Sequence, residues 1–337
     1  MRPGNWICGV VLVAALVATA TTQAGTVIRL GTLAPKGSPW HDAIMQLNAE
    51  WQRISNGEVS IKVYSGVLGG EPEMIRKMRL NEIHAVALSG AGLPIVDRSV
   101  AALQVPLMFE SYAELDYVRD RIAPTLEALI AERQQLQVLN WSDAGWVHFF
   151  VTEPVRTPEQ MRRVRLLTSS GDPDTEALYK QFGYHVVPLP YTDVLVSLQT
   201  GLVQAVQGPP LFALLEQWFG VANHMIRIKW APLVGATLLR MDVWRKIRPE
   251  WRTEMLLAAR RAGDDLRGSI RQLGEDAVPE MHKRGLDVIE LDQAEKGLWR
   301  QEAERTYESL RGTFVPAELF DEVKRLRDEF RRANSAG

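Results

Sequence analysis

The sequence predicts an α/β protein of two lobes, in which mostly parallel sheets are flanked by helices. Residues 154–210 show the order strand, helix, strand, helix, strand, which is typical of a parallel sheet. The chain has 337 residues and 46% apolar content, which is enough for two hydrophobic cores. A helical pattern from Pro249 to Gly285 is long enough to run along both lobes, because roughly thirty residues of helix extend about 45 Å.

The central passage contains clear signals for where each element begins and ends. Its first strand, VRLLTSS, leads into Asp172, a helix N-cap, and Pro173, which is favoured in a first helical turn. Gly183 ends that helix before the strand YHVVPLP, and Gly201 ends the helix VLVSLQT before the strand LVQAVQG. Open parallel sheets bind ligands at the carboxyl ends of their strands, so this passage is expected to contribute to a binding site.

The beginning of the chain has the pattern of a secretory signal peptide, which we assign to residues 1–24. Arg2 precedes the apolar run ICGVVLVAALVATA, which is too short to span a membrane as a helix. Cleavage after Ala20 and an uncleaved anchor are the alternatives. Cys8, the only cysteine, lies within this run and lacks the preceding small residues of a lipoprotein cleavage site. We therefore expect a periplasmic mature protein without disulfides.

The segment after the signal peptide predicts a first α/β lobe. An alternating strand, TVIRLGTLAP, is followed by an amphipathic helix from His41 to Ile54 and by the strand VSIKVYSG. Gly69 and Gly70 form a turn before a helix with Pro72 in its first turn, and the strand AVALSGAG follows. The glycine pair is not a phosphate-binding loop, because no Gly-Lys-Ser/Thr sequence follows it.

The elements around the central passage predict how the chain moves between the lobes. The stretch QVLNWSDAGWVHFFVTEPV, just before the passage, is expected to cross from the first lobe to the second. After the passage, LFALLEQWFGVAN predicts a helix, and IRIKWAPLVGATLLRM predicts two strands, of which the second returns to the first lobe. The long helix is followed by a short strand, LDVIEL, and by a strongly charged, solvated helical region up to Arg332.

The composition and the motifs argue against several functions. The formal net charge of −2 occurs without a polybasic run, which disfavours nucleic acid and anionic membrane surfaces as partners. The sequence lacks the motifs H-E-x-x-H, G-x-S-x-G and G-x-G-x-x-G, and none of its six histidines is two or four residues from another. We therefore expect no catalytic residue, no metal and no cofactor. His148, on the crossing stretch, is the one histidine that merits inspection.

Three segments of the central passage resemble the pattern of one protein family. PVRTPEQMRRVRLLT, FGYHVVPLP and SLQTGLVQAVQGPP follow, without a gap, the pattern of DctP-type solute-binding proteins of TRAP (tripartite ATP-independent periplasmic) transporters. The resemblance implies the periplasmic binding protein fold, with a small molecule captured in the cleft between the lobes and delivered to a TRAP membrane permease. It implies a first lobe of residues 25–144 and about 233–272, and a second lobe of residues 145–232 and about 273–330.

The chain departs from the family pattern at the residues that hold a carboxylate ligand. Leu167 replaces the arginine of the family segment K-I-R-V-P, and Val147 replaces the arginine of a second segment, G-F-R. The family segment D-G-Q-E-N-P has become QAVQGP at residues 204–209. Because an unpaired buried anion is costly, the cleft is expected to take an apolar or neutral ligand. In a shifted register, Arg163 or Arg165 would instead hold an organic acid.

These departures resemble a TRAP subgroup whose binding protein has a hydrophobic pocket and a periplasmic tetratricopeptide-repeat lipoprotein as partner. Two other classes stay open: a ligand-sensing protein that presents its closed form to a receptor, and an enzyme on a two-lobed scaffold. A permease gene beside this one would favour transport, and a sensor kinase gene would favour sensing. The predicted ligand-binding residues are Trp40, Gly70, Glu71, Ser89, Trp146, Val147, Phe149, Leu167, Ser169, Asp172, Gln207, Phe212 and Trp230.

Overall fold

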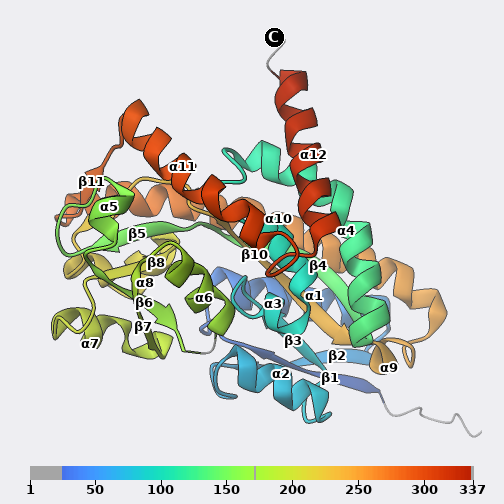
Figure 1. The fold of residues 1–337 in the computed structure, drawn as a ribbon. Coiled ribbons are helices and arrows are strands. Elements are labelled where there is room, and N and C mark those ends of the chain that lie inside the picture. Colours follow the sequence, from blue (N-terminus) through green and yellow to red (C-terminus); the bar gives the residue numbers. More distant parts are fainter. Residues whose placement is uncertain (1–24, 171, 335–337) are drawn as a thin grey trace, which may run out of the picture.

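The computed structural model describes residues 25–170 and 172–334. The predicted signal peptide, residues 1–24, lies outside these described residues. Two sheets, each covered by helices, form two lobes (Figure 1). Lobe I is built on a five-stranded sheet and lobe II on a six-stranded sheet. The predicted two-lobed α/β fold is therefore confirmed.

Each sheet is parallel except for one strand. The strand order is β2-β1-β3-β10-β4 in lobe I, where β10 is antiparallel to its neighbours, and β11-β9-β5-β8-β6-β7 in lobe II, where β5 is. Strands β10 and β5 each follow a strand of the other lobe in the chain, so neither needs the crossover connection that joins parallel neighbours within a sheet. The strands are β1 (Thr26–Thr32), β2 (Val59–Ser65), β3 (Ala85–Leu88), β4 (Leu136–Trp146), β5 (His148–Val151), β6 (Arg165–Ser169), β7 (His185–Leu189), β8 (Ala205–Gly208), β9 (His224–Ile226), β10 (Pro232–Arg240) and β11 (Asp287–Ile289).

The helices begin and end largely at the expected signals. Asp172 caps α6 by accepting a hydrogen bond from the Thr175 amide, and Gly183, with φ of 76°, follows the end of that helix. The helices are α1 (Pro39–Ile54), α2 (Glu71–Arg79), α3 (Leu93–Val96), η1 (Arg98–Gln104), α4 (Tyr112–Gln134), α5 (Pro158–Met161), α6 (Pro173–Gln181), η2 (Tyr191–Asp193), α7 (Val194–Gln199), α8 (Pro210–Leu215), η3 (Trp218–Gly220), α9 (Met241–Trp244), α10 (Pro249–Lys283), α11 (Gln293–Leu310) and α12 (Ala317–Asn334).

Two neighbouring chain segments connect the lobes at the base of the cleft between them. β4 continues into β5 through Val147, and β9 continues into β10 through residues 227–231. The Val147 amide donates to the Ala231 carbonyl at 2.8 Å, and the Trp230 amide donates to the Val147 carbonyl at 3.0 Å. The two connections are therefore joined as a short ladder, which restricts how the lobes can move relative to each other.

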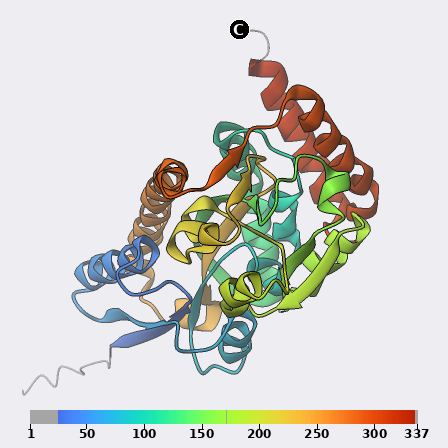
Figure 2. The ribbon, with the colours of Figure 1, turned by 90° about the vertical axis from the view of Figure 1, so that its left-hand side faces the viewer.

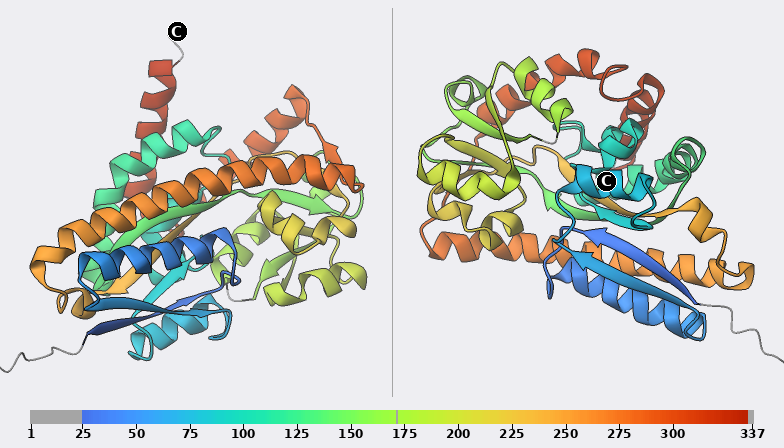
Figure 3. Two further views of the ribbon diagram at one scale, coloured as in Figure 1. Left: turned by 180° about the vertical axis from the view of Figure 1, so that it is seen from behind. Right: turned by 90° about the horizontal axis from the view of Figure 1, so that it is seen from below.

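The long helix α10 forms a third connection behind both sheets (Figure 3). Near its beginning, Met255 and Ala259 are buried in the core of lobe I, whereas Ala277 and Met281 are buried in a core of lobe II. Figure 2 shows α10 nearly end-on beside α1, and the helix also contacts β4 and α8. The helix predicted from its length to run along both lobes does so.

The C-terminal helix α12 departs from the predicted division of the chain. The sequence assigned residues 273–330 to the second lobe, but α12 packs on α4 and η1 of lobe I. Its apolar side chains, which include Phe320 and Val323, join the core that contains Val118 of α4. From its sequence, this region is predicted to be a solvated, charged helix, because most of its residues are charged and only one face is apolar. The segment between α11 and α12 is thus a fourth connection between the lobes among the described residues.

His148, at the start of β5, is a buried titratable group whose Nδ1 has no hydrogen-bond partner among the described residues. Burial lowers the pKa of His148 to about 4. The unfolded chain protonates this histidine below about pH 6.5, whereas the folded state keeps it neutral until about pH 4. Folded-state stability is therefore unaffected above pH 6.5 and falls as the pH drops from 6.5 to 4.

We expect His148→Gln to remove about 2 kcal/mol of the stability loss that the wild type shows between pH 7 and pH 5. The free energy of unfolding in urea at the two pH values measures this difference. His185→Gln, which replaces an exposed histidine on β7, is the matched control and should keep the wild-type pH dependence. Equal pH dependence in wild type and His148→Gln would show that the buried imidazole is protonated without cost.

Candidate functional site

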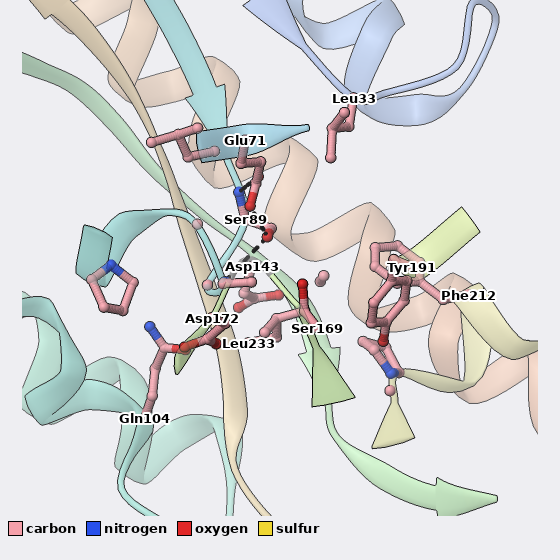
Figure 4. Close-up of a pocket in the computed structure, with 18 of the residues that line it drawn as sticks. Leu33, Glu71, Ser89, Gln104, Asp143, Ser169, Asp172, Tyr191, Phe212 and Leu233 are labelled. Atoms are coloured by element: carbon pink, nitrogen blue, oxygen red, sulfur yellow. Dashed lines mark hydrogen bonds between the residues drawn. The ribbon is translucent and has the colours of Figure 1, made fainter. Parts of the chain in front are cut away.

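A cavity of about 990 Å³ lies between the two lobes. Its walls include Leu33 after β1 and Ser89 after β3 from lobe I, and Ser169 at the end of β6 and Phe212 in α8 from lobe II (Figure 4). The cavity therefore lies at the carboxyl ends of parallel strands from both sheets, as expected for open α/β sheets. Its volume is at the upper end of the range for small-molecule sites.

Most of the residues that the sequence predicted as ligand-binding do line this cavity. They come from distant parts of the chain and meet because both sheets direct their carboxyl edges toward the cleft. The indole of Trp40 and the ring of Phe212 face each other across the cleft, with centroids 5.5 Å apart. The predicted residues that line the cavity are Trp40, Gly70, Glu71, Ser89, Val147, Leu167, Ser169, Asp172, Gln207, Phe212 and Trp230.

Two predicted residues, Trp146 and Phe149, lie outside the cavity lining. Trp146 turns to the opposite side from Val147 and packs on Tyr112 in the core of lobe I, with ring centroids 5.3 Å apart. Phe149 stacks on Trp299 at 5.7 Å and lies behind Trp230, which itself lines the cavity. Both aromatic residues therefore belong to the core, and the interpretation of them as ligand contacts was wrong.

The positions of the missing arginines are filled by buried apolar side chains. Leu167 in β6 is 1% exposed and Val147 is 7% exposed, and both line the cavity. The alternative arginines lie at the other end of β6: Arg163 pairs with Glu159 at 3.3 Å, and Arg165 donates to the Leu202 carbonyl at 2.9 Å. Neither lines the cavity, so the structure does not place an organic-acid clamp at Arg163 or Arg165.

Glu71 places a buried carboxyl group in the wall of lobe I. It is the first residue of α2 and accepts hydrogen bonds from the Ser89 amide at 2.6 Å and the Ser89 hydroxyl at 2.9 Å. Burial raises the pKa of Glu71, against the lowering effect of these hydrogen bonds. A Cβ at Gly92 would lie 2.6 Å from Oε2 of Glu71, so the loop after β3 leaves room for this carboxyl group only with glycine there.

Asp172 places a second carboxyl group on the opposite wall, in lobe II. Its oxygens accept hydrogen bonds from the Thr175 amide at 3.0 Å and the Thr175 hydroxyl at 2.6 Å. The predicted capping role is thus confirmed, and the same carboxyl group also lines the cavity. Burial raises the pKa of Asp172 as well.

Asp143, near the end of β4, is a third acidic residue in the cavity wall, and sequence reasoning missed it. It is 3% exposed, and its Oδ2 accepts bonds from Nε and Nη2 of Arg271 at 3.0 and 2.7 Å. Its Oδ1 is buried and has no hydrogen-bond partner among the described residues. Burial raises the pKa of Asp143, although Arg271 opposes the shift. Its place at the carboxyl end of a strand just before the lobe crossing was the available signal.

The lobes touch along the cavity, so the structure has the cleft closed. One contact is the pair Trp40–Phe212. Another is an ion pair between Arg98 of η1 and Asp174 of α6, with 2.8 Å between Nη2 and Oδ1, and Leu178 of α6 packs against the core of lobe I. Among the described residues that line the cavity, Arg98 is the only lysine, arginine or histidine. No sequence signal pointed to this pair, because its two residues are 76 positions apart.

The acidic and histidine side chains and the helices of the described residues bear on the kind of site. Within residues 25–170 and 172–334, no three His, Cys, Asp or Glu side chains are grouped so that they could hold a metal ion. His148, the histidine that merited inspection, does not line the cavity. In the same described part of the chain, no helix is both long and apolar enough to cross a bilayer.

Comparison with known proteins gives a consistent result. The model of the DctP family, bacterial extracellular solute-binding protein family 7, matches residues 30–312. The 2,3-diketo-L-gulonate-binding periplasmic protein YiaO of Escherichia coli is 24% identical over 286 residues, which cover 82% of this chain and 85% of YiaO. A solute-binding protein of Roseobacter denitrificans is 23% identical over 294 residues, which cover 86% of this chain and 89% of that protein.

A solved structure shares the fold. The TRAP periplasmic solute-binding protein of Xanthobacter autotrophicus with bound β-D-galacturonate superposes with a TM-score of 0.81 at 20% identity. The match covers 89% of this chain and 99% of that protein.

Proposed function

Because the chain belongs to the DctP family of bacterial extracellular solute-binding proteins, we propose that it captures a small molecule in its cleft and delivers it to a TRAP membrane permease. Proteins of this family bind solutes rather than catalyse reactions, and those of TRAP systems work in the periplasm. The observation that carries the proposal is the cavity itself, whose walls come from both lobes and which the lobes enclose. Export through the segment 1–24 is part of the same proposal.

The cavity supports an apolar or neutral ligand rather than a simple carboxylate. YiaO is named as a 2,3-diketo-L-gulonate-binding protein, and the Xanthobacter protein was solved with bound β-D-galacturonate. In this chain, Leu167 and Val147 occupy the positions where the family pattern has arginines, and the one guanidinium in the described lining, that of Arg98, is already paired with Asp174. A carboxylate in this cavity would have to compete with Asp174 for Arg98 or remain without a cation, and a buried carboxylate without a cation is costly.

A periplasmic tetratricopeptide-repeat lipoprotein is proposed as a further partner. The support is the apolar replacement of both arginines, together with the segment SGDPD at residues 170–174, which resembles that subgroup. Co-purification of the two proteins from cells that produce both would test this association.

Native mass spectrometry of the purified mature protein, before and after denaturing extraction, tests the proposed ligand class. We expect a bound molecule with a largely apolar body and no carboxylate to be retained, and Arg163→Ala and Arg165→Ala to retain it as the wild type does, because both side chains lie outside the cavity. Arg98→Ala is the informative comparison. A retained carboxylate that this substitution releases would contradict the proposal and identify Arg98 as the anion-binding residue.

A further inference from the structure

Among the described residues that line the cavity, the one cationic side chain, Arg98, is already paired, which disfavours an anionic ligand. This observation does not distinguish a neutral ligand from a positively charged one, but the acidic residues of the cavity favour a positive charge. We propose that the ligand carries a protonated amine on a largely apolar body, and that Glu71, Asp143 and Asp172 bind the amine; this inference rests on the proposed function.

Half of the carboxyl groups that line the cavity have no cationic partner among the described residues. The described residues of the lining carry six carboxyl groups, and three of these are ion-paired: Glu73 with Arg76 and Lys77, Asp143 with Arg271, and Asp174 with Arg98. Within the same described part of the chain, neither Glu71 nor Asp172 forms an ion pair with a cationic side chain; both accept hydrogen bonds from neutral donors. The carboxylates that line the cavity are Glu71, Glu73, Asp143, Asp172, Asp174 and Glu216.

Asp143 provides an independent indication of a missing partner. Its side chain is almost fully buried, it lines the cavity, and its Oδ1 has no hydrogen-bond donor among the described residues (Figure 4). Arg271 serves only the other oxygen and is shared with Asp116, to which it donates at 2.6 and 2.8 Å. An unpaired buried acceptor is costly, and a small rotation of the Asp143 side chain toward the cavity would let an ammonium group, with up to three N–H donors, satisfy it.

Glu71 and Asp172 have acceptor capacity left as well. A carboxylate offers about four lone-pair sites. Glu71 accepts from the amide and hydroxyl of Ser89 and from the Gly92 amide, and Asp172 accepts from the amide and hydroxyl of Thr175 and from the Asp174 amide, so about one site remains on each. Glu71 belongs to lobe I and Asp172 to lobe II, so closure brings two carboxyl groups without a counter-cation into one cavity. Their mutual repulsion, which contributes to the raised pKa of Glu71, opposes closure over an empty cavity.

A cation between the walls would turn this repulsion into attraction from both sides. The closed state would then be favoured only with the amine present, because the ligand's contacts with both carboxyl groups exist only in that state. The rest of the wall suits an apolar body and a cation together. Aromatic rings of Trp40, Tyr191 and Phe212 line the cavity, and such rings attract ammonium groups by their negative faces.

Isothermal titration calorimetry at pH 7 with matched probes tests the proposal. One series is tryptamine, tryptophol and indole-3-acetate, and the other is octylamine, octanol and octanoate, so that each body is offered with a positive, neutral or negative group. We expect the amine of each series to bind at least about tenfold more tightly than its alcohol, because charge-assisted hydrogen bonds are roughly twice as strong as neutral ones. The carboxylates should bind most weakly.

Three variants connect this preference to the named residues. Glu71→Gln and Asp172→Asn preserve shape, and asparagine is also a good N-cap, so both are expected to fold. Each should lower the ratio of amine to alcohol affinity by about three- to tenfold and leave the alcohol affinity unchanged. Glu216→Gln, at an exposed carboxyl group of the cavity lining, is the control and should leave the ratio unchanged.

The proposal is overturned if an alcohol or a carboxylate binds as tightly as its amine, if neither amine binds at millimolar concentration, or if both variants keep the wild-type ratio. These outcomes are separable from failure of the proposed function. Tight binding of octanol or indole-3-acetate with lobe closure would refute the amine and leave solute capture intact. Only a protein that is purified empty and binds none of the six probes would also count against solute capture.

Discussion

Gly263→Ala is expected to destabilise the protein by about 3 kcal/mol. Gly263 lies in α10 where that helix crosses β4, and a Cβ there would be 2.7 Å from the Asn140 Cβ and 2.7 Å from the Trp141 carbonyl oxygen. Neither atom is the tip of a flexible side chain, so the helix or the strand has to shift. Overpacking a close contact costs about 1–3 kcal/mol, and here the displaced element also joins the two lobes.

Gly268→Ala, five positions further along α10, is the matched control. A Cβ at Gly268 would meet no heavy atom within 4 Å, so the better helix propensity of alanine should stabilise the protein by about 0.5–1 kcal/mol. Urea denaturation of the two variants gives effects of opposite sign if the contact with β4 decides the outcome. Stabilisation by both substitutions would mean that α10 is not seated closely on β4.

The parts of the fold that were predicted from sequence are those with local chemical signals. Asp172, Pro173 and Gly183 mark the ends of α6 through capping and backbone preference, and these effects depend on neighbouring residues only. The position of α12 has no such signal. Its apolar stripe predicts burial but not the partner, and only the tertiary fold shows that the stripe packs on α4.

The candidate site shows the same limit. Leu167 and Val147 were found because the family pattern fixes their register, and they line the cavity. Trp146 and Phe149 were misassigned because aromatic residues near a lobe junction have the same sequence appearance in a core and in a cleft. Asp143 was missed because its importance depends on Arg271, 128 positions away, which leaves one of its oxygens unpaired.

The contact between Trp40 and Phe212 predicts the largest effect on binding. The two rings belong to different lobes, so the contact exists only when the cleft is closed. Trp40→Ala is expected to weaken binding of the tightest of the six probes by about 10- to 100-fold, because it removes both a ligand-facing ring and a contact specific to the closed state. Calorimetry measures the affinity, and small-angle scattering measures closure.

A double-mutant cycle separates these two contributions. If the ring pair stabilises closure, Trp40→Ala and Phe212→Ala together should cost less than the sum of the two single substitutions, by about 0.5–1.5 kcal/mol. Additive losses would mean that each ring contacts the ligand independently and that the pair does not hold the lobes together. The Arg98–Asp174 ion pair would not compensate for this loss, because its Arg98 side chain is 58% exposed and the pair is expected to contribute less than about 1 kcal/mol.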